Sequence, residues 1–101
     1  MASAQHDPVL AALLHPFVNG LLPWPPQALF LRARAGIAGH GRGFVATQPF
    51  RPEAVSLQRA GIELLEEDAL PAAAFPLVLV LPPRQREEAR ALLARACAAV
   101  A

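Results

Sequence analysis

The feature that most constrains the fold is the apolar run from Leu77 to Leu81, which ends at two consecutive prolines. Its five successive aliphatic residues predict a strand that is buried on both faces, as in a parallel sheet. A helical pattern follows at once, because Pro83 suits a first helical turn and Glu87 and Glu88 lie near the positive end of a helix. Apolar residues then recur at helical spacing, namely Ala89, Leu92, Leu93, Ala96 and Val100. A buried strand that leads directly into a helix is half of a βαβ unit, so the sequence predicts an α/β fold.

The composition favours a packed globular body, because 54% of the 101 residues are hydrophobic and only 17% are charged. The net charge of +1 gives no broad electrostatic attraction to nucleic acid or to a membrane surface. The single cysteine, Cys97, excludes an internal disulfide, and its place beside the apolar stripe predicts a small buried hydrophobe. Residues 1–6 are expected to be a disordered leader without a basic targeting signal, and the apolar run after them is too short for a bilayer. We therefore expect a cytoplasmic protein.

Three further strands and two further helices are expected upstream of this unit. A helix begins at Pro8 with Asp7 as its cap, and Pro16 should end or kink it. A second helix begins at Pro52 and stops at Gly61, which suits the left-handed conformation. The strand candidates are residues 28–33, 44–48 and 62–65. This order predicts a Rossmann-like partial sheet of about four mainly parallel strands with flanking helices, in one domain over residues 1–101.

The connecting segments carry expectations of their own. The residues from Arg34 to Arg42 are too few for a full crossover helix, so a parallel pairing of the first two strands requires a tight connection. The glycines in this segment can form a phosphate cradle or a plain flexible turn, and the turn is the favoured interpretation. Residues 21–26 should be extended, with Trp24 covering the edge of the core; a proline-rich docking ligand is the alternative. Residues 66–68 are expected to form a solvated acidic turn.

Three stretches together resemble a known family. They are PFVNGLLPWPPQALFLRAR at 16–34, QPFRPEAVSLQRAG at 48–61 and LVLVLPPRQREEARALLARA at 77–96. They are similar to the N-terminal part of bacterial class I S-adenosylmethionine-dependent methyltransferases of the ribosomal RNA guanine-N2 type, which contain two methyltransferase-like domains in tandem. In that family the first domain is a degenerate copy of the fold, and the second carries the cofactor and the chemistry. The resemblance therefore implies a non-catalytic, methyltransferase-like N-terminal domain that is incomplete on its own.

The chain departs from the family pattern at the positions that methyl transfer needs. Arg32 and Arg34 follow the first strand, where the S-adenosylmethionine carboxylate and sulfonium would approach, and the second strand ends at Thr47 without a ribose-binding carboxylate. Base-methylating relatives carry Asn-Pro-Pro followed by Tyr or Phe after the fourth strand. Here Pro82 and Pro83 match that motif, but the amide and the aromatic ring are missing. The resemblance thus implies a degenerate substrate motif, no catalytic residue and no S-adenosylmethionine bound by this chain.

The arginines are the candidate functional residues. The carboxyl ends of parallel strands share one edge of a sheet, so Arg34, Arg51 and Arg84 can converge there on an RNA backbone; a solvated surface is the alternative. Glu87 and Glu88 are expected to pair with Arg84 and Arg90 along the last helix. No metal site is expected, since the histidines at 6, 15 and 40 are far apart and have no carboxylate or thiol pattern near them.

Three functions remain open from the sequence. The leading interpretation is a non-catalytic domain that supports or positions RNA for a guanine-N2 methyltransferase activity carried by a partner domain. The alternative is a free-standing α/β module that dimerises and binds no nucleotide, and a complete methyltransferase is the least favoured. In the family the fourth strand is flanked by a fifth that follows the last helix. The strand at 77–81 would therefore have an unpaired apolar edge, which predicts a self-dimer or packing against the partner domain through that edge.

Overall fold

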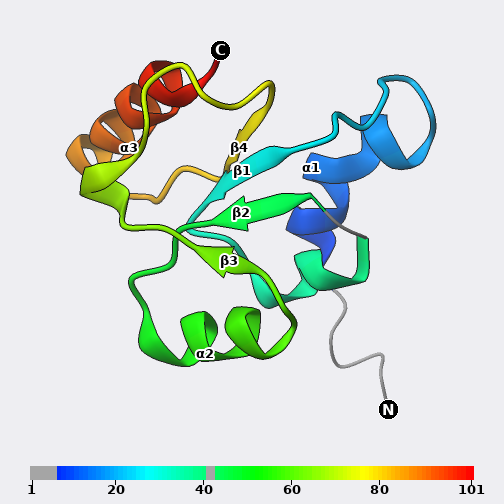
Figure 1. Cartoon of the computed structure of the whole chain (residues 1–101), viewed down its shortest axis with the longest axis horizontal. Helices are drawn as coiled ribbons and strands as arrows, with labels where there is room; N and C mark the ends of the chain where they lie inside the picture. The colour runs from blue at the N-terminus through cyan, green and yellow to red at the C-terminus, as the bar shows by residue number, and fades with distance from the viewer. Residues whose placement is uncertain (1–6, 41–42) are drawn as a thin grey trace.

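A four-stranded parallel sheet forms the centre of the protein. The computed structural model describes residues 7–40 and 43–101, so the expectations for residues 1–6 and for Gly41 and Arg42 fall outside it. The strands are β1 (Ala28–Leu31), β2 (Phe44–Ala46), β3 (Glu63–Leu64) and β4 (Val78–Val80). Their spatial order is β3-β2-β1-β4, and each neighbouring pair is parallel (Figure 1). The predicted fold class is therefore confirmed.

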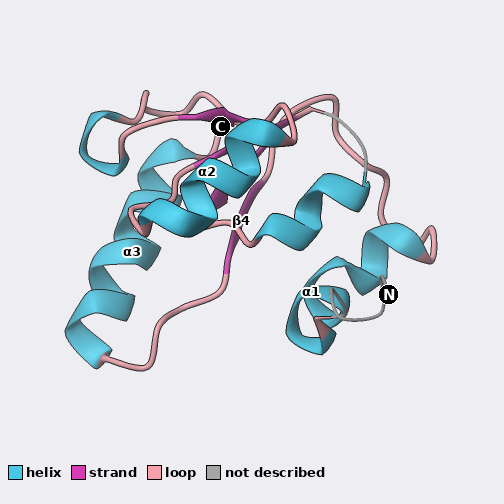
Figure 2. Ribbon diagram, turned by 90° about the horizontal axis from the view of Figure 1, so that it is seen from below, coloured by secondary structure: helices cyan, strands magenta, loops and turns pink. Residues whose placement is uncertain are grey.

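Three α-helices and two short 3-10 helices surround the sheet. They are α1 (Pro8–Val18), η2 (Ala35–His40), α2 (Arg51–Arg59), η3 (Glu67–Ala69) and α3 (Arg86–Ala99). Figure 2 shows α1 and α3 on opposite sides of the sheet. None of the helices within 7–40 and 43–101 combines the length and the apolar character needed to span a bilayer.

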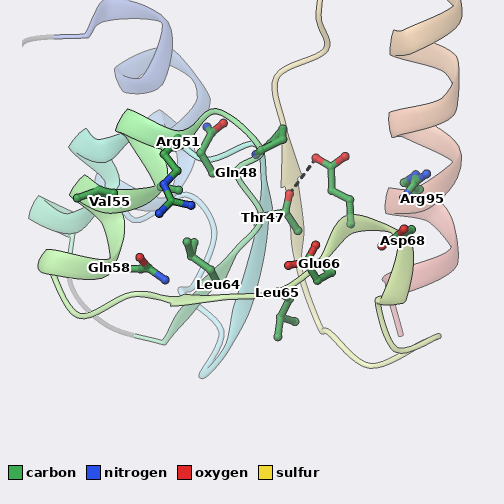
Figure 3. A pocket seen from close by; sticks show the side chains of 13 residues that line it. Thr47, Gln48, Arg51, Val55, Gln58, Leu64, Leu65, Glu66, Asp68 and Arg95 are labelled. Carbon is green, nitrogen blue, oxygen red and sulfur yellow. Dashed lines mark hydrogen bonds between the residues drawn. The ribbon is translucent and has the colours of Figure 1, made fainter.

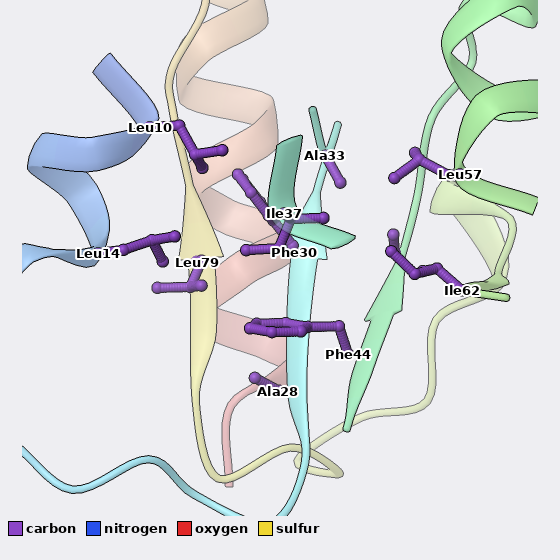
Figure 4. Close-up of a cluster of buried hydrophobic side chains, with 11 residues drawn as sticks. Leu10, Leu14, Ala28, Phe30, Ala33, Ile37, Phe44, Leu57, Ile62 and Leu79 are labelled. Atoms are coloured by element: carbon purple, nitrogen blue, oxygen red, sulfur yellow. The ribbon is translucent and has the colours of Figure 1, made fainter. Parts of the chain in front are cut away.

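Strand β1 lies at the centre of the core, and all of its side chains are buried. Ala28 and Phe30 face a cluster that includes Leu10 and Leu14 of α1 and Ile37 of η2 (Figure 4). The intervening residues of the strand face a second cluster on the α3 side, which includes Leu29, Leu31, Phe75, Leu92, Ala96 and Ala99. The sheet is thus covered on both faces, as expected for parallel strands joined by helices.

The first helix forms as the sequence predicts, except at its end. The Asp7 side chain accepts hydrogen bonds from the backbone N–H groups of Val9 and Leu10, and Pro8 occupies the first turn. The helix continues past Pro16 to Val18, so Pro16 does not end it. The proline removes only the hydrogen bond that its own N–H would donate.

The proline-rich segment after α1 brings Trp24 to the rim of the core, as predicted. The indole stacks on the Phe17 ring at a centroid distance of 4.7 Å and meets the Phe44 ring edge-on at 5.7 Å. These contacts join the end of α1 to the beginning of β2.

The connection between β1 and β2 is tight, but it is more ordered than the favoured turn interpretation implied. Residues Ala35–His40 form the 3-10 helix η2, and its Ile37 is completely buried between α1 and the sheet. The apolar Ile37 within the glycine-rich sequence explains this outcome, because its burial fixes the connection against the core.

The unit formed by β4 and α3 differs from the prediction in three respects. Strand β4 is not buried on both faces, since it lies at the sheet edge with Leu79 buried and Val78 and Val80 half-buried. Helix α3 does not follow at once: Pro83 lies in the connection, and Gln85 is the N-cap. The helix also buries a narrower stripe than expected, so Leu93 is 43% exposed and Cys97 is exposed.

The two chain segments that flank this unit meet beside β4. Val100 pairs with Phe75 in a parallel bridge. The Phe75 N–H donates to the Ala99 carbonyl at 3.1 Å, and the Ala101 N–H donates to the Phe75 carbonyl at 2.8 Å. The chain after α3 therefore runs alongside the segment that enters β4.

Two glycines with positive φ offer a matched test of the packing around β2. Gly43 has φ +84°, and a Cβ there would lie 2.5 Å from the Pro26 carbonyl oxygen, whereas Gly61 has φ +87° and open space around it. Gly61→Ala should cost about 1 kcal/mol of unfolding free energy from backbone strain alone. Gly43→Ala should cost about 1–3 kcal/mol more because of the added clash. Urea denaturation measures both, and equal losses would contradict this packing.

Candidate functional site

The carboxyl edge of the sheet is the place where a parallel α/β fold positions ligands. The chain passes from β1 to β2 to β3 in one direction and then returns to the other side of β1 to form β4. This reversal creates a topological switch point between the carboxyl ends of β1 and β4, where open α/β sheets bind ligands in a crevice.

Arg32 follows β1 directly and occupies this point. Its backbone has φ 54°, a value that is unusual for a residue with a side chain. Its N–H donates to the Thr47 hydroxyl at 2.9 Å, a contact that holds the backbone in place.

The Arg32 guanidinium joins two other elements to β1. Its Nε and Nη2 donate to the Glu67 carboxylate at 2.9 and 3.3 Å, and its Nη1 donates to the Glu88 carboxylate at 2.7 Å. The fully buried Thr47 donates its hydroxyl proton to Glu67 at 3.1 Å. We call these four residues, Arg32, Thr47, Glu67 and Glu88, the Arg32 cluster.

In the Arg32 cluster the arginine charge is fully paired within the protein, by two carboxylates. The hydrogen bonds that Arg32 donates to Glu67, and then the one that it donates to Glu88, raise the pKa of the Arg32 guanidinium above its already high ordinary value, so its charge is permanent. The arginine side chain is 28% exposed and that of Glu67 is 17% exposed, which shields their interaction from water. An arginine held in this way is not free to bind an incoming anion.

The sequence did not predict this cluster. Glu67 does not lie in a solvated turn, because it is half-buried in η3 and bonded to Arg32 and Thr47. Glu88 contacts Arg32 from the first turn of α3, and no ion pair joins it to Arg84 or Arg90. The available signal was a threonine at the end of a buried strand together with an acidic run in a following loop.

The three predicted RNA-contact arginines lie after β1, β2 and β4, on the carboxyl side of the sheet. Arg34 is the one of the three that is paired, since its Nη1 donates to both Asp7 carboxylate oxygens at 3.0 Å. Arg51 begins α2 and is exposed, and Arg84 is exposed in the connection between β4 and α3. Neither forms an ion pair with another described residue. Pro82 and Pro83 lie in the same connection as Arg84, the first exposed and the second half-buried.

A cavity of about 760 Å³ opens beside the Arg32 cluster, at the carboxyl ends of β2 and β3. Figure 3 shows Arg51, Val55 and Gln58 of α2 along one side and Asp68 and Arg95 along the other. Leu64 and Leu65 supply an apolar surface between the two sides. Its size falls within the range of ligand sites in proteins.

The described residues contain no metal-binding arrangement. No group of three or more histidine, cysteine, aspartate or glutamate side chains within 7–40 and 43–101 is close enough to hold an ion. His15 contacts the Asn19 amide, whereas His6 and the side chain of His40 are outside the description.

Comparison with known proteins gives no family assignment. No family model matches the sequence, and no curated protein is significantly similar to it.

Replacing Arg32 should weaken the junction between the sheet, η3 and α3. Arg32→Met keeps most of the alkyl stem but leaves the Glu67 carboxylate without its cation, so unfolding free energy should fall by about 2 kcal/mol. Arg32→Lys should lose less unfolding free energy, because an ammonium keeps the charge. It should still lose some, because an ammonium cannot reproduce the planar fork that binds Glu67 and Glu88 together. Arg90→Met, on the exposed side of α3, is the control and should change stability by less than about 0.5 kcal/mol. An unchanged unfolding free energy in Arg32→Met would refute the structural role of the Arg32 cluster.

The pair of Asp7 and Arg34 should make stability depend on acid pH. Burial raises the pKa of the Asp7 carboxyl, but hydrogen bonds from Arg34, Leu10 and Val9 and the Arg34 charge outweigh it, so the pKa lies below its ordinary value of 3.8. A lowered pKa in the folded state stabilises the protein fully above the unfolded value, and the contribution is lost as pH falls through the folded value.

Asp7→Asn keeps a capping oxygen and removes the charge. It should therefore cost about 0.5 kcal/mol at neutral pH and less at an acid pH below the lowered pKa of Asp7. Thermal denaturation of Asp7→Asn, Arg34→Gln and the double variant measures this coupling. A cost of Asp7→Asn that is the same at both pH values would contradict it.

Proposed function

We propose that this chain is a non-catalytic, methyltransferase-like N-terminal domain that positions RNA for a ribosomal RNA guanine-N2 methyltransferase activity carried by a partner domain. The proposal rests on the resemblance of the three sequence stretches and agrees with the parallel order β3-β2-β1-β4. It also places the protein in the cytoplasm, where ribosomal RNA is processed.

The observation that carries the non-catalytic part is the Arg32 cluster. A cofactor with a carboxylate and a sulfonium needs an open crevice at the end of β1. Here the Arg32 guanidinium forms ion pairs with Glu67 and Glu88, and the Thr47 hydroxyl donates to Glu67, so these side chains occupy that position. S-adenosylmethionine thus belongs, in this proposal, to the partner domain.

The RNA-positioning part is supported by the exposed arginines at the carboxyl edge. Arg51 and Arg84 are available for phosphate contacts, and Arg34 can exchange its Asp7 partner for a phosphate at the cost of that ion pair. The overall charge of +1 gives little general attraction, so binding depends on where these residues lie.

Replacing all three arginines should weaken RNA binding in a salt-dependent way. With Arg34, Arg51 and Arg84 changed to Gln, affinity for single-stranded ribosomal RNA segments should fall, and the slope of log K against log salt should become shallower by about 2. Arg59→Gln is a matched control for Arg51→Gln, since the two residues lie at opposite ends of α2. Fluorescence anisotropy between about 50 and 200 mM salt measures the slope. An unchanged slope would remove these residues from the interface.

The second candidate is a dimerisation module. It is favoured by the outer edge of β4, with which no strand within residues 7–40 and 43–101 pairs. On its other side β4 pairs with β1, where the Leu29 N–H donates to the Leu77 carbonyl. In a parallel ladder this register directs the backbone groups of Val78 outward, toward the unpaired edge. An unpaired edge with half-buried valines is suited to adding another strand.

A proline at Val78 separates the two candidates. Val78→Pro removes the outward N–H and leaves the hydrogen bonds to β1 intact, so a dimer that forms through this edge should become monomeric. Light scattering at micromolar concentration is the measurement, with circular dichroism as a check on folding. A wild-type chain that is already monomeric would exclude self-dimerisation and leave the partner domain as the occupant of the edge.

A further inference from the structure

The cavity beside the Arg32 cluster has walls of different charge. The α2 wall carries Arg51 near the positive end of the helix dipole, with Gln58 two turns further along. The opposite wall carries the exposed carboxylates of Glu66 and Asp68 and the half-buried Arg95. The Arg51 and Arg95 guanidinium groups have no ion pair or hydrogen bond with any other described residue.

The floor of the cavity is apolar. Leu64, Leu65 and Val55 are each half-buried and line the same space. A ligand that fits this arrangement has a flat apolar body, an anionic group at one end and hydrogen-bond donors at the other.

We propose that this cavity binds one nucleotide, with the phosphate at Arg51, the base against the leucine and valine surface, and the base N–H donors on Glu66 and Asp68. The chemistry is that of a nucleoside monophosphate, either free or within an RNA strand. The RNA arm of this inference rests on the proposed function, and the cavity would then hold one nucleotide of the bound strand.

Charge placement gives the site a base preference. Glu66 and Asp68 accept hydrogen bonds and offer no donor, whereas Arg95 on the same wall donates them. Adenine, cytosine and guanine each carry an exocyclic amine that donates two protons, whereas uracil presents a single N–H between two carbonyl oxygens. Uracil therefore has one N–H to offer to two carboxylates, where the other bases have at least two, so it should bind least well.

The experiment is a calorimetric titration of the whole chain with the four nucleoside 5′-monophosphates and with short single-stranded RNAs that differ at one position. Adenosine, cytidine and guanosine monophosphates should each bind at least about fivefold more tightly than uridine monophosphate. Arg51→Gln should weaken the preferred nucleotides about tenfold, and the matched Arg59→Gln should have little effect.

A tryptophan at Val55 fills the cavity and tests the placement of the base. Val55→Trp should abolish nucleotide binding, whereas Val18→Trp adds the same indole to an exposed position on α1 and should not. The double variant Glu66→Gln with Asp68→Asn should remove the discrimination against uracil while keeping phosphate binding. This variant keeps the test valid if Val55→Trp fails to fold.

The outcomes separate the inference from the proposed function. RNA binding that Val55→Trp leaves unchanged, with no affinity for monophosphates, would overturn the cavity as a nucleotide site and leave RNA positioning intact. Monophosphate binding without RNA binding would support the cavity and overturn RNA positioning. An absence of both would overturn both proposals.

Discussion

The ion pairs made by the Arg32 guanidinium are the interaction on which the carboxyl edge of this protein depends. One side chain joins the end of β1 to η3 through Glu67 and to α3 through Glu88, while its backbone is held by Thr47 at the end of β2. Each of these elements comes from a different part of the sequence. Without the cation, the half-buried Glu67 would lose the partner that offsets its desolvation, and the edge would lose its common anchor.

The same interaction also explains why the general ligand position of this fold is not the open site of this chain. A parallel sheet with a switch point between β1 and β4 offers a general place for a ligand. In this chain that place is filled by the protein's own charges, and the open cavity lies at the ends of β2 and β3. The structure thus shows a parallel α/β fold, in which the residues at the switch point bind one another and join three elements of the protein.

Much of the fold was predictable because it follows local rules. Asp7 and Pro8 define the start of α1, Gly61 ends the turn after α2 in the left-handed conformation, and the aliphatic run around Leu79 forms a strand. The sequence-based prediction was wrong about the burial of side chains whose neighbours are distant in the chain. Cys97 and Leu93 are exposed because the short β4 edge provides too little surface to cover the full width of α3.

The candidate site was predictable only in part for the same reason. The positions of Arg34, Arg51 and Arg84 follow from parallel topology, which brings the carboxyl ends of strands to one edge. Their partners do not, because the pairing of Arg34 with Asp7 and of Arg32 with Glu67 spans 27 and 35 residues, respectively. The cavity depends on η3 standing opposite α2, and the acidic run from Glu66 to Asp68 gave no sign of that arrangement.

The most direct test of the account is a calorimetric titration of the chain with S-adenosylmethionine. The Arg32 cluster predicts no heat of binding at high micromolar ligand, because the ion pairs of Arg32 with Glu67 and Glu88 already occupy the end of β1. Saturable one-to-one binding would contradict the account, since it would show that the ligand displaces these carboxylates and that the edge forms a cofactor site.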